Sequence, residues 1–86
     1  MDGSNPSYIF ARGQAYYLSQ MWELAMVDFT EYIAINPIGA GRGYYYRGSC
    51  YKNLSQKSQA IEDFLKAKEL DPSWAAGADQ ALSSLK

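Results

Sequence analysis

Few side chains in this sequence have the types and spacing that catalysis requires. The chain has no histidine, so the commonest general base and the commonest metal ligand are missing. No Cys-x-x-Cys, glycine-rich phosphate loop or Gly-x-Ser-x-Gly motif occurs. The adjacent carboxylates Glu62 and Asp63 lie in a polar stretch with helical character, which is typical of a solvated face. These observations predict a protein that is not an enzyme and that has no cofactor and no metal site.

The charged residues that do recur suggest ion pairing. Arg12 is followed by Asp28, and 35 residues later Arg47 is followed by Asp63 at the same spacing. An arginine stem can lie over apolar surface while its guanidinium holds a carboxylate with two hydrogen bonds. We therefore expect each Arg–Asp pair to bridge two neighbouring helices.

These pairs belong to a longer pattern that occurs twice, at an offset of 35 residues. Each copy contains Arg-Gly-x-x-Tyr, then an alanine, an Asp-Phe pair and a residue followed by proline. The shared positions are Gly13, Tyr16, Ala25, Phe29 and Pro37 in the first copy and Gly48, Tyr51, Ala60, Phe64 and Pro72 in the second. A period of this length is the signature of a repeat architecture, in which each unit covers the apolar face of the next.

Composition excludes several classes of protein. The formal net charge is −1, whereas a protein that binds nucleic acid through phosphates needs clustered lysine and arginine. No stretch approaches the roughly 20 apolar residues that span a membrane. Residues 1–6 lack the pattern of a signal peptide, and the single Cys50 cannot form an internal disulfide. We therefore expect a cytoplasmic protein with no nucleic-acid or membrane partner.

The order of elements follows from periodicity and from proline. Apolar residues recur at helical spacing, which predicts helices over residues 6–19, 22–35, 41–54, 57–70 and 74–85. Asn5 and Pro6 are suited to begin the first helix, and Ser73 is suited to cap the last one. We divide the chain into a lead (1–5), a first repeat (6–40), a second repeat (41–72) and a final helix (73–86).

This combination of residues resembles the tetratricopeptide repeat (TPR). The family has a small residue and a tyrosine in the first helix of each repeat, an alanine and an aromatic residue in the second, and a closing proline. Gly13 and Pro37 are 24 residues apart, as are Gly48 and Pro72, and this distance is the same as in the family. The resemblance implies an all-α fold of antiparallel helical hairpins, stacked as a short right-handed α-solenoid of five helices, with residues 73–86 as a capping helix.

Close contact within each hairpin requires small side chains. We expect Gly13 to face Ala25 and Gly48 to face Ala60, so that the helices approach to about 8–9 Å. The chain departs from the family pattern at the place of the usual tryptophan, which holds Ile9 and Tyr44, and at a usual leucine, which is arginine in both copies. Tyr32 stands where a small residue such as Ala67 is typical, and the period has one residue more than the usual 34, which we place in the link over residues 38–41.

The 35-residue period also resembles pentatricopeptide repeats, which bind RNA. The chain is not basic, however, and two repeats would read too few bases. The resemblance to TPR proteins implies instead a protein-interaction module that binds a short peptide in a concave groove lined by the first helices. Carried over position by position, the groove residues are Phe10, Gln14, Tyr17, Arg42, Tyr45, Ser49 and Lys52.

Some TPR proteins hold a chaperone C-terminus with a carboxylate clamp of lysine and asparagine. Phe10, Gln14, Tyr45 and Ser49 occupy the corresponding places, so that clamp is missing here. The alternative function is a structural or self-assembling unit, including a truncated or engineered repeat, that associates through its uncapped ends and has no dedicated ligand. The first repeat has Tyr8, Ile9 and Ala11 near such an end.

Overall fold

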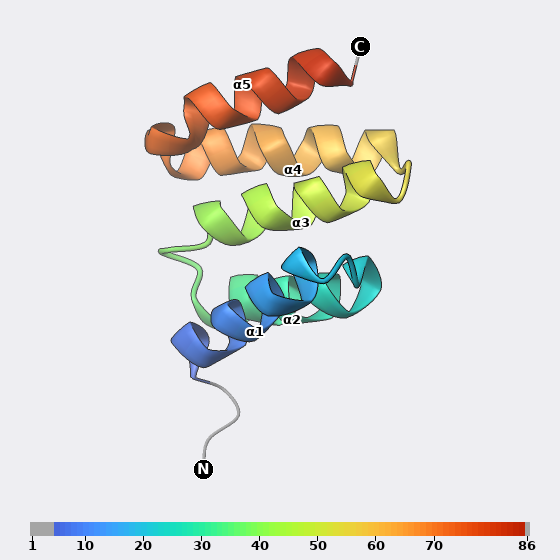
Figure 1. Ribbon diagram of the computed structural model, residues 1–86. Helices are drawn as coiled ribbons and strands as arrows, with labels where there is room; N and C mark the ends of the chain where they lie inside the picture. The colour runs from blue at the N-terminus through green and yellow to red at the C-terminus, as the bar shows by residue number, and fades with distance from the viewer. Residues whose placement is uncertain (1–4, 86) are drawn as a thin grey trace.

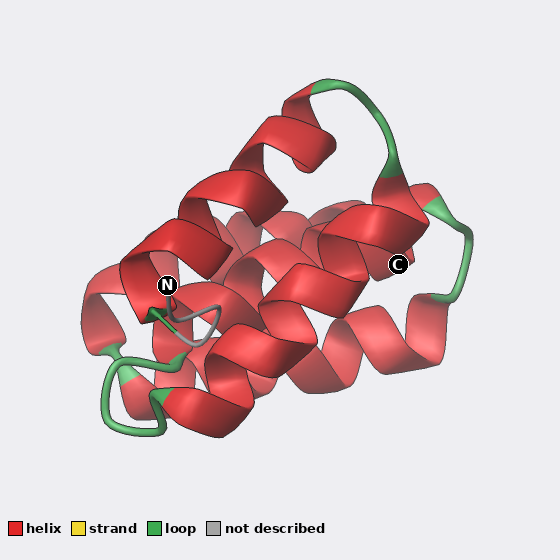
Figure 2. Ribbon diagram, turned by 90° about the horizontal axis from the view of Figure 1, so that it is seen from below, coloured by secondary structure: helices red, strands yellow, loops and turns green. Residues whose placement is uncertain are grey.

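The computed structural model describes residues 5–85, and the regular elements of that range are all helical. They are α1 (Pro6–Leu18), α2 (Trp22–Ile35), α3 (Gly41–Asn53), α4 (Lys57–Leu70), the 3₁₀ turn η1 (Pro72–Trp74) and α5 (Ala75–Ser84). α1 packs on α2 and α3 packs on α4 as two hairpins, α2 joins the hairpins by packing on α3, and α5 covers α4. Figure 1 shows this stack from the first hairpin to α5, and Figure 2 shows the short loops that join the helices. The predicted α-solenoid of five helices is confirmed.

The first helix begins as expected, whereas the last one does not. The Asn5 side chain accepts a hydrogen bond from the backbone N–H of Ser7 at 2.9 Å, and Pro6 takes the first helical position. Ser73 does not cap the last helix. The Asp71 carboxylate instead accepts hydrogen bonds from the Ser73 N–H at 3.1 Å and from its hydroxyl at 2.7 Å. The chain therefore forms η1 first, and α5 begins at Ala75.

Both hairpins turn through the same motif. Gln20 and Ser55, 35 residues apart, have positive φ angles of 62° and 63°. The N–H of Met21 donates to the Tyr16 carbonyl, and the N–H of Gln56 donates to the Tyr51 carbonyl, as in the Schellman motif that ends many helices. The two hairpins therefore share the same turn geometry.

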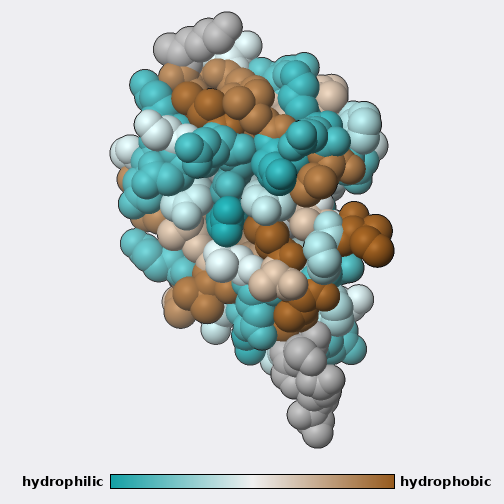
Figure 3. All heavy atoms as spheres, turned by 180° about the vertical axis from the view of Figure 1, so that it is seen from behind, coloured by the Kyte–Doolittle hydropathy of each residue, from teal (hydrophilic) through white to brown (hydrophobic). Residues whose placement is uncertain are grey.

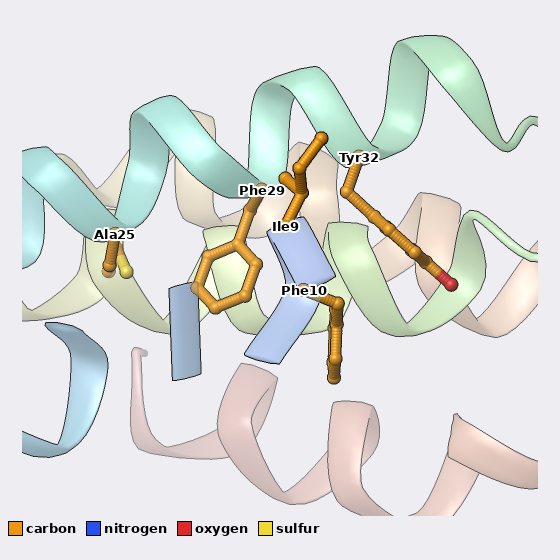
Figure 4. Close-up of a cluster of buried hydrophobic side chains, with 6 residues drawn as sticks. Ile9, Phe10, Ala25, Phe29 and Tyr32 are labelled. Carbon is orange, nitrogen blue, oxygen red and sulfur yellow. The ribbon is translucent and has the colours of Figure 1, made fainter. Parts of the chain in front are cut away.

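The first apolar cluster lies between α1, α2 and α3. Its buried members are Ile9, Phe10, Ala25, Phe29, Tyr32 and Cys50, and Figure 4 shows how they lie. Ile9, which we expected near an open edge, is fully buried. A second, smaller cluster of Ala60, Phe64 and Ala78 joins α4 to α5. The core is therefore a chain of small clusters and not one central core, as in other stacked repeats.

The glycines of the two first helices face phenylalanine and not alanine. A Cβ atom at Gly13 would lie 2.8 Å from the Phe29 ring, and one at Gly48 would lie 3.2 Å from the Phe64 ring. The nearest ring therefore follows the expected alanine by one helical turn in both hairpins. Ala25 is fully buried, but the residue that needs the glycine is the ring that follows it.

The bulky Tyr32 is accommodated by Gly43 of α3 and hydrogen-bonds to the link between the repeats. A Cβ atom at Gly43 would lie 2.8 Å from the Tyr32 ring, so α3 can approach α2 only because Gly43 has no side chain. The Tyr32 hydroxyl accepts hydrogen bonds from Asn36 Nδ2 at 3.0 Å and Arg42 Nε at 2.9 Å, and it donates to the Gly39 carbonyl at 3.2 Å. Tyr32 therefore holds the longer link in place.

The two predicted ion pairs are confirmed. Arg12 donates to Asp28 at 2.9 and 2.7 Å, and Arg47 donates to Asp63 at 2.8 and 3.0 Å, each through two nitrogens. Both carboxylates are buried, but the Arg12 side chain is 42% exposed and the Arg47 side chain only 19%. Arg47 also donates to Thr30 Oγ1 at 3.2 Å, so this pair additionally connects the two hairpins.

The pKa of Asp63 reflects its burial. Desolvation raises the pKa of this carboxyl above its usual value, and the hydrogen bonds and charge of Arg47 oppose that shift. Removal of Arg47 would leave the desolvation effect without its compensation.

We predict that Arg47→Met lowers the free energy of unfolding by about 3–5 kcal/mol, because it leaves a buried carboxylate without a partner. Arg12→Met should cost clearly less, because water reaches that site and screens the pair. Urea unfolding at neutral pH measures both losses. In Arg47→Met the loss should shrink in mild acid, since the raised pKa of Asp63 lets the carboxyl become neutral in the folded state. Equal losses in the two variants, unchanged in acid, would contradict this assignment.

Cys50 provides a second test of the core. The side chain is fully buried, and burial raises the pKa of its thiol to about 12. Because the thiolate is the reactive form, we expect a thiol reagent to label the native protein at neutral pH far more slowly than the protein in denaturant. Immediate stoichiometric labelling of the native state would mean that this part of α3 is accessible to solvent.

Within residues 5–85, no helix has the length and apolar character required to cross a membrane.

Candidate functional site

The first helices of the hairpins and α5 share a face, and a cleft opens on it between α3 and α5. The cleft has a volume of about 260 Å³ and is lined by Tyr45, Lys52, Gly77, Gln80, Ala81 and Ser84. Tyr45 and Lys52 are two helical turns apart on α3, and the other four residues form one face of α5. Two of the predicted groove residues therefore meet side chains that the prediction did not include.

Tyr45 is held firmly in this cleft. Its ring stacks on Trp74 with centroids 4.7 Å apart and meets the edges of Phe64 and Tyr46. A Cβ atom at Gly77 would lie 3.2 Å from the Tyr45 hydroxyl oxygen, so the glycine makes room for it. Burial, with smaller contributions from Tyr17 and Tyr46, raises the pKa of the Tyr45 phenol. The hydroxyl thus stays protonated at neutral pH and is able to donate a hydrogen bond.

The other polar groups of the cleft are solvated. Lys52, Gln80 and Ser84 are exposed, and no acidic side chain within residues 5–85 forms an ion pair with Lys52. The cleft thus combines an ammonium group, an amide and two hydroxyls with the small residues Gly77 and Ala81. These groups suit the backbone and the carboxylate of a peptide.

Phe10 does not lie on this face, which corrects the prediction. Its side chain is 5% exposed and packs on the rings of Phe29, Tyr32 and Tyr46, with centroids 5.0–5.6 Å apart. Arg42 closes this cluster from outside, with its guanidinium carbon 4.1 Å from the Phe10 ring centroid. Phe10 is a core residue, and Arg42 stabilises it through a cation–π contact.

The remaining predicted residues surround Tyr46. Tyr17 packs edge-on against Tyr46 and against Trp22, and Gln14 Nε2 donates to the Tyr46 hydroxyl at a long distance of 3.4 Å. Ser49 is half-buried and does not line the cleft. The part of the face on α1 is therefore filled by aromatic packing, and the open part lies at α3 and α5.

Tyr46 and the α5 residues were missing from the sequence prediction. The tyrosine contacts five other aromatic rings and is the centre of the packing between the hairpins. The α5 residues had a signal in the sequence, since the 35-residue period applied once more to Arg42, Tyr45 and Ser49 leads to Gly77, Gln80 and Ser84. This correspondence is hard to recognise, because few of the repeat's typical residues occur after Pro72.

Comparisons with known proteins agree with this geometry. A sequence model described as "Tetratricopeptide repeat" matches residues 41–73, which include α3 and α4. The structure is similar to the TPR domain of Arabidopsis OM64, with a TM-score of 0.84 and 26% sequence identity over 96% of this chain and 69% of that one. The sequence matches no curated protein. Residues 41–73 thus match a tetratricopeptide repeat, and the whole chain is similar in structure to a solved TPR domain.

Proposed function

We propose that this chain binds a short peptide segment of a partner protein in the cleft between α3 and α5. TPR domains are typically non-enzymatic scaffolds for protein interaction, and the first helices of their repeats line the binding groove. The observation that carries the proposal is the open cleft in which Tyr45 and Lys52 meet Gln80 and Ser84. On the α1 part of the same face, aromatic packing leaves less room for a ligand.

The charges of the cleft indicate which peptide fits best. Lys52 is exposed and forms no ion pair with another described residue, and the protonated Tyr45 hydroxyl is a second donor. A peptide with a free C-terminal carboxylate or an acidic side chain would satisfy both groups. Because the cleft has only about 260 Å³, we expect weak binding. Its dissociation constant should be on the order of micromolar or poorer.

A pair of peptide libraries tests this proposal. Fluorescence polarisation would compare labelled short peptides that end in a free carboxylate with the same peptides ending in an amide. We predict that the free acids bind tighter and that Lys52→Met lowers their affinity by about tenfold or more, because a charge-assisted hydrogen bond is lost. Tyr45→Phe should weaken binding less, since it removes one neutral donor and keeps the ring.

Lys57→Met is the matched control, because Lys57 is an exposed lysine at the start of α4 and does not line the cleft. It should leave affinity unchanged. If Lys57→Met and Lys52→Met reduce binding equally, or if acids and amides bind alike, net charge and not the cleft governs binding.

Self-assembly remains a second candidate function because the first hairpin exposes large apolar side chains. Leu24 and Val27, one turn apart on α2, are 45% and 63% exposed, and Leu18 is 80% exposed. Static light scattering over a range of concentrations tests this candidate. Assembly predicts a mass above that of one chain at high concentration and a return to one chain in Val27→Lys. A single-chain mass at every concentration would exclude it.

A further inference from the structure

A second cleft lies on the opposite side of α5 from the peptide cleft. It has a volume of about 530 Å³ and is lined by Ile61 and Leu65 of α4 and by Asp79, Leu82, Ser83 and Leu85 of α5. At 100° per residue, Asp79 and Leu82 lie on the side of α5 away from Gly77, Gln80 and Ser84, whereas Ser83 lies between the two sides. Figure 3 shows a hydrophobic patch at this end of the molecule.

The packing of α5 is that of the first helix of a further repeat. Ala78 is fully buried, as is Gly43 at the position 35 residues earlier. Leu85 packs on the second apolar cluster, just as Cys50 belongs to the first. The offset of 35 residues also relates Tyr45 on the α3 side of the peptide cleft to Gln80 on the α5 side. The 35-residue period therefore continues in space through α5.

In the hairpin of α3 and α4, two neighbouring residues of α3 make close contacts with α4. Arg47 holds Asp63 of α4 by two hydrogen bonds, and Gly48 accommodates the Phe64 ring. The same period places Leu82 where α3 has Arg47 and Ser83 where it has Gly48, and both line the second cleft. This cleft is thus the place where the second helix of a third hairpin would pack.

We propose that the cleft between α4 and α5 binds one amphipathic helix of a partner protein, which packs on α5 as α4 packs on α3. The argument is the continuity of this surface with the interface between α3 and α4. The site is separate from the proposed peptide site, because the two occupy opposite faces of α5.

The charges at this surface define what the partner helix must carry. Where the earlier interface has Arg47 hydrogen-bonded to Thr30, the cleft has Leu82 and Leu65. A carboxylate at the place of Asp63 would meet Leu82 in place of Arg47. The lysine at the cleft, Lys68, is already paired with Asp79, so burial of that carboxylate would be strongly unfavourable. The partner helix must therefore be apolar at this position.

This requirement argues against a second copy of the chain as the occupant. Both second helices of this chain, α2 and α4, have an aspartate at the critical place, namely Asp28 and Asp63. Each of these carboxylates is already held by its own arginine. A helix from another protein, with an apolar residue there, meets the requirement that α2 and α4 fail.

Two synthetic peptides test the proposal directly. The first has the sequence of α4, residues 57–70, and the second has the same sequence with Asp63→Leu; both carry neutral ends. Labelled peptides are titrated with the full chain and followed by fluorescence anisotropy. We expect the Asp63→Leu peptide to bind at least about tenfold tighter than the natural one, although both are weak because a 14-residue helix is marginal in water.

A reciprocal variant of the protein makes the test specific. Leu82→Arg with Leu65→Thr recreates the Arg47–Thr30 arrangement in the cleft, so the preference between the two peptides should reverse. Leu82 is partly buried against the second cluster. Ser83→Arg, at an exposed position on the cleft, therefore serves as a second variant that leaves the core intact and should weaken both peptides at least about fivefold.

Lys52→Met is the control from the opposite face and should leave binding of both peptides unchanged. The proposal is overturned if the Asp63→Leu peptide does not bind, if the two peptides bind equally, or if Lys52→Met and not Ser83→Arg removes binding. A concentration-dependent dimer that Ser83→Arg dissociates would also overturn it, since a second copy would then cover the cleft. None of these outcomes tests whether the separate cleft at Lys52 prefers peptides with a carboxylate, so the two proposals can fail independently.

Discussion

The close contact between a glycine and a phenylalanine ring inside each hairpin is the constraint on which the rest of the structure depends. The Gly13–Phe29 and Gly48–Phe64 contacts set how near the two helices of a hairpin lie. At that separation, an arginine and an aspartate one residue before the glycine and the ring can form two hydrogen bonds across the hairpin. A larger side chain at either glycine would displace the ring, and with it the carboxylate next to it.

The Arg–Asp ion pairs restrict how the helices that share this apolar contact can pack. A buried carboxylate contributes little net stability, but it strongly disfavours any packing in which its arginine is elsewhere. Because Arg47 also reaches Thr30, the pair fixes the angle between the hairpins as well as the register inside one of them. The aromatic rings around Tyr46 then fill the space that this angle creates.

The sequence predicted the helices and the ion pairs well because both depend on local spacing. Pro37 and Pro72 end helices, and the Arg–Asp pairs recur at a fixed offset, so each inference required only the period. Side-chain direction at the interface between hairpins was harder. Phe10 lies at a groove position by family register, yet Tyr32 and Gly43 draw α3 close enough to bury it. No pattern within one repeat encodes a contact among three helices.

The fifth helix shows a related limit. Read by residue type, residues 73–86 lack most of the repeat signature and suggest a cap. A cap in a solenoid needs a polar outer face, because nothing packs on it. The exposed positions of α5 are mainly polar, as a cap requires, whereas Leu82 and the following Leu85 are partly buried against the second apolar cluster. Residue type alone did not indicate that two of these polar residues, Gln80 and Ser84, line a cleft together with Tyr45 and Lys52.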